Sequence, residues 1–133
     1  MSGARFDVPG VDLDLVARSH GWYDLPPFEW DESRRTLSFV FLADGTPERV
    51  ALSARNGGVR VAATAPVRLA RPVVARVLDL GSELGPFHAL CAERRGEGFG
   101  WIADRRAGRV LRAPTLFEDA VKVLCTTNCS WAL

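Results

Sequence analysis

Two pairs of residues have the types and spacing to bind a metal ion. His88 and Cys91 are three positions apart, and Cys125 and Cys129 are four apart. On helices, each pair would lie on one face and could offer soft ligands to one ion. Each cysteine also falls on or beside an apolar run, where a reduced, buried thiol is the common alternative. The spacing matches no zinc finger, so we predict no metal and no cofactor, and a small zinc-bound structural protein remains an alternative.

Arginines form a second group of residues that could bind a ligand. Residues 94–112 contain six arginines and only two acidic residues, namely Arg94, Arg95, Arg105, Arg106, Arg109 and Arg112 with Glu97 and Asp104. The whole chain holds 17 basic and 16 acidic residues, a net charge of +1, so the basic character is local. Such a segment is typical of phosphate contact, and a solvated loop and helix face is the alternative reading.

The sequence offers no recognisable hydrolytic centre. Neither His20 nor His88 has a serine or cysteine and a carboxylate in a triad arrangement. Glycines alternate over 96–100, but no Lys-Ser or Lys-Thr pair follows them, so a flexible turn is expected there. We therefore assign no catalytic residue.

Residues 1–66 are predicted to form a small antiparallel sheet. Apolar and polar residues alternate over 11–15, 36–41 and 50–54, with the period of two that half-buried strands require. Asn56-Gly57 tolerates the positive φ of a tight turn, so 50–64 is predicted to be a hairpin.

Residues 67–133 are predicted to be helical. One helix is expected over 72–80, with Pro72 in its first turn, and a shorter one follows Ser82. Residues 94–100 are expected to form a loop.

The best-marked helix follows Pro114. Thr115 and Glu118 have the spacing of a capping box, and an apolar stripe runs from Leu116 to Cys125, which predicts a face that packs against another element. Trp131-Ala132-Leu133 is an apolar ending without a cap or a charged tail. The predicted fold class is thus α+β, with a small antiparallel sheet domain in 1–66 and the truncated start of an α-helical domain in 67–133.

The C-terminal segment resembles a known family. RAPTLFEDAVK at 112–122 and CTTNCSWAL at 125–133 resemble the junction between the N-terminal and helical domains of helix-hairpin-helix DNA glycosylases, the relatives of 8-oxoguanine DNA glycosylase and 3-methyladenine DNA glycosylase II. The likeness covers nearly the whole chain at low identity, and only its last twenty residues are specific. The upstream segments that share it are Leu13-Asp14-Leu15, Ser19-His20-Gly21-Trp22-Tyr23, Pro27-Phe28-Glu29-Trp30 and Phe87-His88-Ala89-Leu90.

This resemblance implies a TATA-binding-protein-like sheet domain and a role in base-excision DNA repair. Such enzymes extrude a damaged nucleotide from the duplex into a pocket. By resemblance, Asn128 enters the vacated gap and hydrogen-bonds the orphaned base, since an amide both donates and accepts. A polar cap on the third helix is the alternative for Asn128.

The resemblance also implies a base pocket and further DNA contacts. His20, Gly21 and Trp22 would line the pocket, although His20 stands where the 8-oxoguanine pattern has glycine, which puts specificity for that lesion in question. The predicted DNA-binding residues are Asn128, Thr127, Arg109 and Arg112.

The catalytic aspartate of the family lies beyond the asparagine cluster, and neither Asp119 nor Lys122 is in a catalytic motif. The chain alone is therefore expected to be inactive and to bind damaged double-stranded DNA weakly. A separate chain carrying the helix-hairpin-helix half is a further expected partner.

Composition limits the remaining classes. With 47% apolar and 25% charged residues, the chain is neither disordered nor low in complexity. Its apolar runs are too short to cross a bilayer, and its N-terminus has no secretory pattern, so a cytoplasmic location, on the nucleoid in a bacterium, is expected without membrane contact. A non-catalytic interaction module, or half of a split enzyme, is the rival function.

Overall fold

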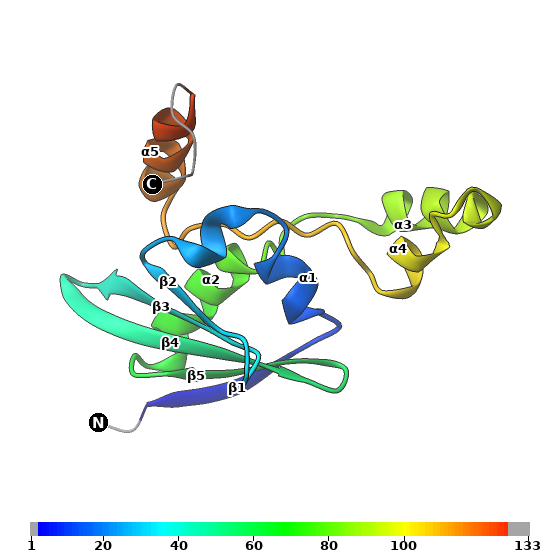
Figure 1. Cartoon of the computed structure of the whole chain (residues 1–133). Coiled ribbons are helices and arrows are strands. Elements are labelled where there is room, and N and C mark those ends of the chain that lie inside the picture. The colour runs from blue at the N-terminus through cyan, green and yellow to red at the C-terminus, as the bar shows by residue number, and fades with distance from the viewer. Residues whose placement is uncertain (1–2, 128–133) are drawn as a thin grey trace.

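A five-stranded antiparallel sheet forms the centre of the fold in the computed structural model, which describes residues 3–127 (Figure 1). The strand order is β1-β5-β4-β3-β2. The strands are β1 (Ala4–Pro9), β2 (Phe28–Asp31), β3 (Thr36–Ala43), β4 (Thr46–Arg55) and β5 (Gly58–Ala63). The predicted α+β class and the antiparallel sheet are confirmed.

The predicted hairpin is formed by β4 and β5. Val50 pairs with Ala63 and Arg55 pairs with Gly58, so the chain reverses at Asn56-Gly57. Gly57 has a φ of +83°, a left-handed conformation that glycine adopts without steric cost.

The prediction of a strand over 11–15 is wrong. Residues Leu13–Ala17 form the short helix α1, because the carboxylate of Asp12 accepts a hydrogen bond from the Leu15 amide at 3.3 Å and caps the helix. Leu13 and Val16 are buried at helical spacing, and this periodicity competes with alternation in so short a run. Strands β1 and β2 were not predicted.

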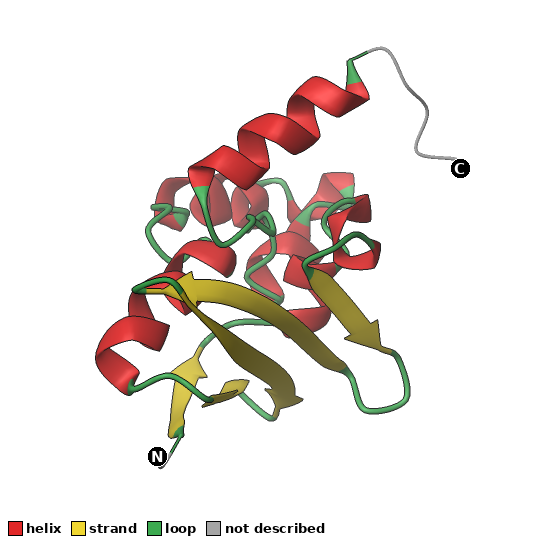
Figure 2. Cartoon of the chain, turned by 90° about the vertical axis from the view of Figure 1, so that its left-hand side faces the viewer, coloured by secondary structure: helices red, strands yellow, loops and turns green. Residues whose placement is uncertain are grey.

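One face of the sheet carries the core. Alternate residues of the strands point inward, and α1 and α2 (Val67–Val77) cover them, so the helices lie on one side of the sheet (Figure 2). The shared core includes Leu37, Phe39, Leu52 and Val61 from the sheet and Ala70, Val74 and Val77 from α2. The helical segment that follows residue 66 is therefore packed into the same core as the sheet.

Helix α2 differs from the predicted helix over 72–80. It begins at Val67 and ends at Val77, with Pro72 inside it and Leu78 at its C-cap. Ala70, Val74 and Val77 of α2 are buried in the shared core, and this burial outweighs the loss of one backbone donor at proline.

We call the sheet together with α1 and α2 the sheet unit. A helical arm projects from it (Figure 1). It consists of α3 (Gly85–Glu93), the 3-10 turn η2 (Arg95–Glu97) and α4 (Gly100–Asp104), and we call residues 85–104 the arm. The predicted short helix is confirmed as α3, but its N-cap is Leu84 and not the expected Ser82, whose hydroxyl donates to Asp79 instead. The predicted loop contains η2, and no helix was expected at α4. Arg105, directly after α4, is held to Asp12 with Nη2 and Oδ2 2.6 Å apart, which ties the arm to the start of α1.

Helix α5 (Leu116–Thr126) has the predicted capping box. The Glu118 amide donates to Thr115 Oγ1 at 3.2 Å, and the Thr115 amide donates to Glu118 Oε2 at 2.9 Å. The expected packing of its apolar stripe is wrong for the described chain, because Leu116, Phe117 and Leu124 are 70–76% exposed. Cys91 is buried as expected of a thiol, whereas Cys125 is exposed on this outer side of α5, and Cys129 lies outside the described residues.

No helix among residues 3–127 is long and apolar enough to cross a membrane.

Candidate functional site

A cleft of about 460 Å³ lies between the 3-10 turn η1 (Gly21–Asp24), the segment before α5, and the first turns of α5. We call this space the cleft. Its lining residues are His20, Trp22, Arg76, Val110, Leu111, Arg112, Leu116 and Asp119. Three residues that the sequence singled out, His20, Trp22 and Arg112, are therefore brought to one place from two distant parts of the chain.

His20 joins the two walls of the cleft. Its Nδ1 accepts a hydrogen bond from the Trp22 amide at 3.2 Å, so the ring proton must reside on Nε2, which donates to the Leu111 carbonyl at 2.7 Å. The imidazole also packs edge-on against the Trp22 indole, with ring centroids 4.6 Å apart. With both nitrogens engaged, His20 holds the wall together and has no free nitrogen for proton transfer.

Arg112 is held by a buried carboxylate. Its guanidinium lies 2.9 Å from Asp79 Oδ1, and its backbone amide donates to the Val77 carbonyl at 3.1 Å. Asp79 is 5% exposed and also accepts a hydrogen bond from Ser82 Oγ at 2.6 Å. Nearly half of the Arg112 side chain remains exposed, so this residue neutralises Asp79 and still presents positive charge at the cleft.

The other predicted site residues among 3–127 do not line the cleft. Arg109 donates hydrogen bonds to the backbone carbonyls of Asp79 and Ser82. Thr127 follows α5, and its hydroxyl donates to the Leu124 carbonyl at 2.8 Å. Gly21 is exposed at the start of η1, next to the lining residues His20 and Trp22. Asn128 lies outside the described residues.

Asp119 lines the cleft and attaches α5 to the segment before it and to α2. Its Oδ1 accepts from the Ala113 amide at 2.7 Å, and its Oδ2 pairs with Arg76. Arg76 in turn donates to the Ala113 carbonyl at 3.1 Å. Asp119 lies outside any catalytic motif, and the only signal in the sequence for its role is an acidic residue in the first turn of a capped helix.

Lys122, the single lysine of the chain, is next to Trp22 and does not line the cleft. Its Nζ is 5.2 Å from the centroid of the Trp22 ring and 5.0 Å from that of Phe28. Within residues 3–127 it is the one buried side-chain nitrogen or oxygen without a hydrogen-bond partner. Burial lowers the pKa of Lys122, and the neighbouring Glu118 and Asp119 oppose that shift.

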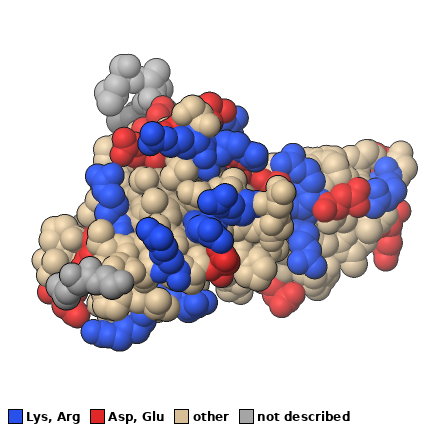
Figure 3. All heavy atoms as spheres, turned by 90° about the horizontal axis from the view of Figure 1, so that it is seen from below, with Lys and Arg blue, Asp and Glu red and all other residues tan. Residues whose placement is uncertain are grey.

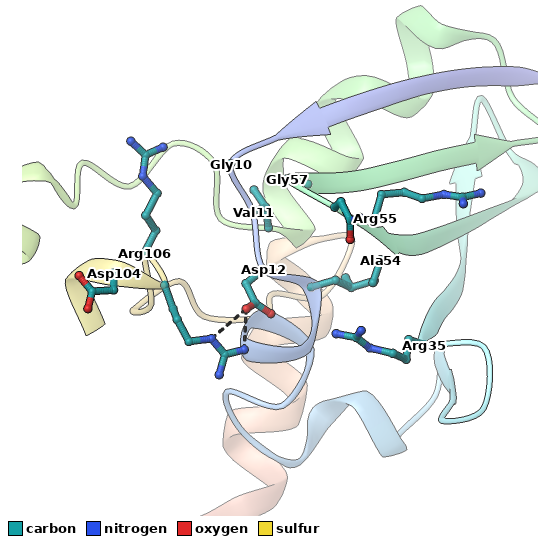
Figure 4. Close-up of a pocket in the computed structure, with 13 residues that line it drawn as sticks. Gly10, Val11, Asp12, Arg35, Ala54, Arg55, Gly57, Asp104 and Arg106 are labelled. Atoms are coloured by element: carbon teal, nitrogen blue, oxygen red, sulfur yellow. Dashed lines mark hydrogen bonds and ion pairs between the residues drawn. The ribbon is translucent and has the colours of Figure 1, made fainter. Parts of the chain in front are cut away.

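A second hollow, of about 390 Å³, is more basic but less organised (Figure 4). Its charged lining residues are Arg35, Arg55, Arg105 and Arg106 with Asp12 and Asp104. Arg105 pairs with Asp12 and Arg35 pairs with Asp14. Figure 4 shows the side chains of Arg55 and Arg106 extending away from each other. These guanidinium groups do not converge on one ligand position.

The face of the molecule seen from below carries both basic and acidic side chains (Figure 3). Seen from below in Figure 3, basic side chains are spread over the body and the arm, with acidic ones among them. In the part of the chain that the structure describes, no three His, Cys, Asp or Glu side chains gather as a metal site would require. The cleft is consequently the candidate site, since it combines an aromatic wall, apolar surface and guanidinium groups.

No family model matches the chain, and no curated protein or solved structure matches it.

Proposed function

We propose that this chain forms the base-pocket and DNA-binding part of a base-excision DNA glycosylase, and that a damaged base turned out of the duplex enters the cleft. The cleft volume of about 460 Å³ falls in the range of about 300–1,000 Å³ common for small-molecule sites. The observation that carries the proposal is the convergence of Trp22 and His20 with Arg112 around this space. An aromatic wall suits stacking of a flipped base, and guanidinium groups suit its phosphate.

The architecture supports the finer assignment of a TATA-binding-protein-like domain. The described elements run in the order strand, helix, four antiparallel strands, helix, with both helices on one face of the sheet. An antiparallel sheet at the N-terminal end is what the resemblance implies, and the capped helix α5 carries the segment that resembles the family most specifically.

The proposal assigns the chemical step to a helix-hairpin-helix part that is not among these elements. The exposed apolar side chains of α5, together with Phe87 and Trp101 of the arm, offer surface for a helical body to cover. Figure 1 shows α5 and the arm at opposite ends of the extended segment that joins α4 to α5. This chain alone is accordingly expected to bind damaged double-stranded DNA weakly in the cytoplasm and to cleave no glycosidic bond.

A non-catalytic interaction module is the second candidate function. The observation that favours it is again α5, which buries no residue and presents Leu116, Phe117 and Leu124 outward. Such a helix can dock in the groove of a protein partner through its apolar side.

Fluorescence anisotropy with matched duplexes separates the two functions. One duplex carries a single damaged purine such as 8-oxoguanine opposite cytosine, which presents a base that Trp22 can stack on, and the other is undamaged. We expect the chain to prefer the damaged duplex, Trp22→Ala to remove the preference, and Trp101→Ala, which changes an exposed indole on α4, to retain it.

Equal binding of both duplexes, or a preference that survives Trp22→Ala, would contradict the proposal. Release of a damaged base by the 133-residue chain itself would contradict the assignment of catalysis to another part.

A further inference from the structure

We infer that Lys122 is a positioning residue for the cleft: its ammonium group holds the indole of Trp22 in the cleft wall and seats α5 on the sheet unit. This role rests on the proposed function, in which the cleft receives the damaged base. It extends that proposal to a residue that does not line the cleft.

The way in which α5 is attached to the sheet unit supports this role. This helix buries none of its residues, and its apolar side faces outward. Its inward side carries Asp119 and Lys122, which are three positions apart and so lie on one face. Asp119 fixes the first turn through Arg76 and the Ala113 amide. Lys122 is the charged residue that fixes the next turn.

The environment of the Lys122 amine also supports this role. Nζ is removed from solvent and has no hydrogen-bond acceptor among residues 3–127, yet an ammonium group in that position requires compensation. The faces of Trp22 and Phe28, about 5 Å away, supply it through cation–π attraction. The lowered pKa agrees with this dry location.

Trp22 both lines the cleft and lies next to Lys122. The indole contacts His20 through an edge-on ring pair, and Lys122 lies near its ring from the α5 side. Phe28, the second ring near Nζ, is a buried residue of β2 that also packs against Phe39. The ammonium therefore links the Trp22 ring to a ring that lies in the core.

Two substitutions isolate the charge. Lys122→Met keeps the unbranched stem and removes the charge, whereas Lys122→Arg keeps a cation that can lie over an aromatic ring. Val123→Ala, a change at a half-exposed neighbour on α5, is the matched control. The readout is the indole N–H resonance of Trp22 in a ¹H–¹⁵N spectrum, assigned by its loss in Trp22→Phe.

We expect Lys122→Met to shift the Trp22 resonance and to speed amide exchange in α5, with Lys122→Arg and Val123→Ala close to the wild type. Binding of the damaged duplex should weaken about 3- to 10-fold in Lys122→Met and recover in Lys122→Arg, the size expected when one cation–π contact is lost. An unchanged Trp22 resonance in Lys122→Met, or an Arg variant that behaves like the Met variant, would overturn the inference.

A labelling experiment on unmutated Lys122 is independent of the fold of these variants. Because the chain has one lysine, peptide mapping after reaction with a water-soluble amine reagent reports on Nζ alone. We expect slow labelling in the wild type and at least about tenfold faster labelling in Trp22→Leu, since the covering ring is gone. Fast labelling of the wild type would also overturn the inference.

The spectral and labelling readouts involve no DNA. If they succeed and the chain shows no preference for damaged duplexes, the positioning role stands and the glycosylase proposal fails. If they fail while the preference is present, the proposed function stands and Lys122 is not its positioning residue.

Discussion

The Nε2 atom of His20 lies 2.7 Å from the carbonyl oxygen of Leu111, although 91 positions separate the two residues. A second bond runs alongside it, from the Leu111 amide to Ser19 Oγ at 2.9 Å. The backbone of Leu111 thus has both its donor and its acceptor satisfied by the residues just before η1. This pair of bonds joins two distant segments of the chain that both line the cleft.

Replacing His20 by alanine tests this tie. The change removes the bond to Leu111 and the acceptor of the Trp22 amide, so we expect the free energy of unfolding to fall by about 1–3 kcal/mol in urea denaturation. His88→Ala is the matched control, because His88 makes one similar bond, 2.8 Å to the Ala107 carbonyl, beside the arm. The Trp22 resonance should move in His20→Ala only. If His20→Ala is as stable as the wild type, the hydrogen bonds of His20 do not contribute to the free energy of unfolding.

Local patterns predicted the parts of the fold that local physics determines. The hairpin at Asn56-Gly57 and the capping box of Thr115 and Glu118 each depend on residues within a few positions of one another, and both are present. The run at 11–15 was misread because alternation over five residues also fits one helical turn, and only the cap bond from Asp12 separates the two. Strand β1 pairs with β5 across 49 to 59 positions, and no local signal marks that pairing.

The candidate site was predictable only in part. The resemblance singled out His20, Trp22 and Arg112, and the structure places all three around one cleft. The partners that fix them are backbone carbonyls and a buried carboxylate, which leave no pattern in the sequence. The outward apolar stripe of α5 could not be foreseen either, because amphipathic spacing indicates that a helix has two faces and does not say which one meets the described core.

Arg112 and Asp79 allow the structural and the DNA-binding roles of one arginine to be separated. Arg112→Ala leaves the carboxylate of Asp79 buried without its cation, so we expect a loss of about 1–3 kcal/mol in the free energy of unfolding. Asp79 has a φ of +53°, which asparagine also tolerates, so adding Asp79→Asn should restore most of that stability. If Arg112 also contacts a phosphate, the double variant should be stable and still bind duplex DNA less tightly, with a smaller dependence on salt. Recovery of both properties would assign Arg112 a structural role alone.

Thr115→Ala should loosen α5 without unfolding the sheet unit. The threonine hydroxyl caps the Glu118 amide, and loss of such a cap costs about 0.5–2 kcal/mol. Because α5 buries no residue, this cost should appear as faster amide exchange confined to 116–126, with the exchange of β4 and β5 unchanged. Thr126→Ala, at the far end of the same helix, is the control, since its hydroxyl only returns to the Val123 carbonyl. Uniform acceleration throughout the chain would show instead that α5 unfolds together with the sheet.

Acid should loosen the arm internally, at the contact between Arg95 in η2 and Asp104 in α4. Two hydrogen bonds of 2.7 and 2.8 Å from the Arg95 guanidinium hold the pKa of Asp104 below its ordinary value of 3.8. A carboxyl whose pKa is lowered by folding adds stability above its unfolded value and loses it as the pH falls through the folded one. The protection factors of the α4 amides, which correct for the intrinsic pH dependence of exchange, should therefore hold above pH 3.8 and fall below it. Arg95→Gln should return the carboxyl titration, followed by ¹³C resonance, toward 3.8. Since both side chains are more than half exposed, global unfolding should respond little. An Asp104 midpoint that is the same with and without Arg95 would contradict this account.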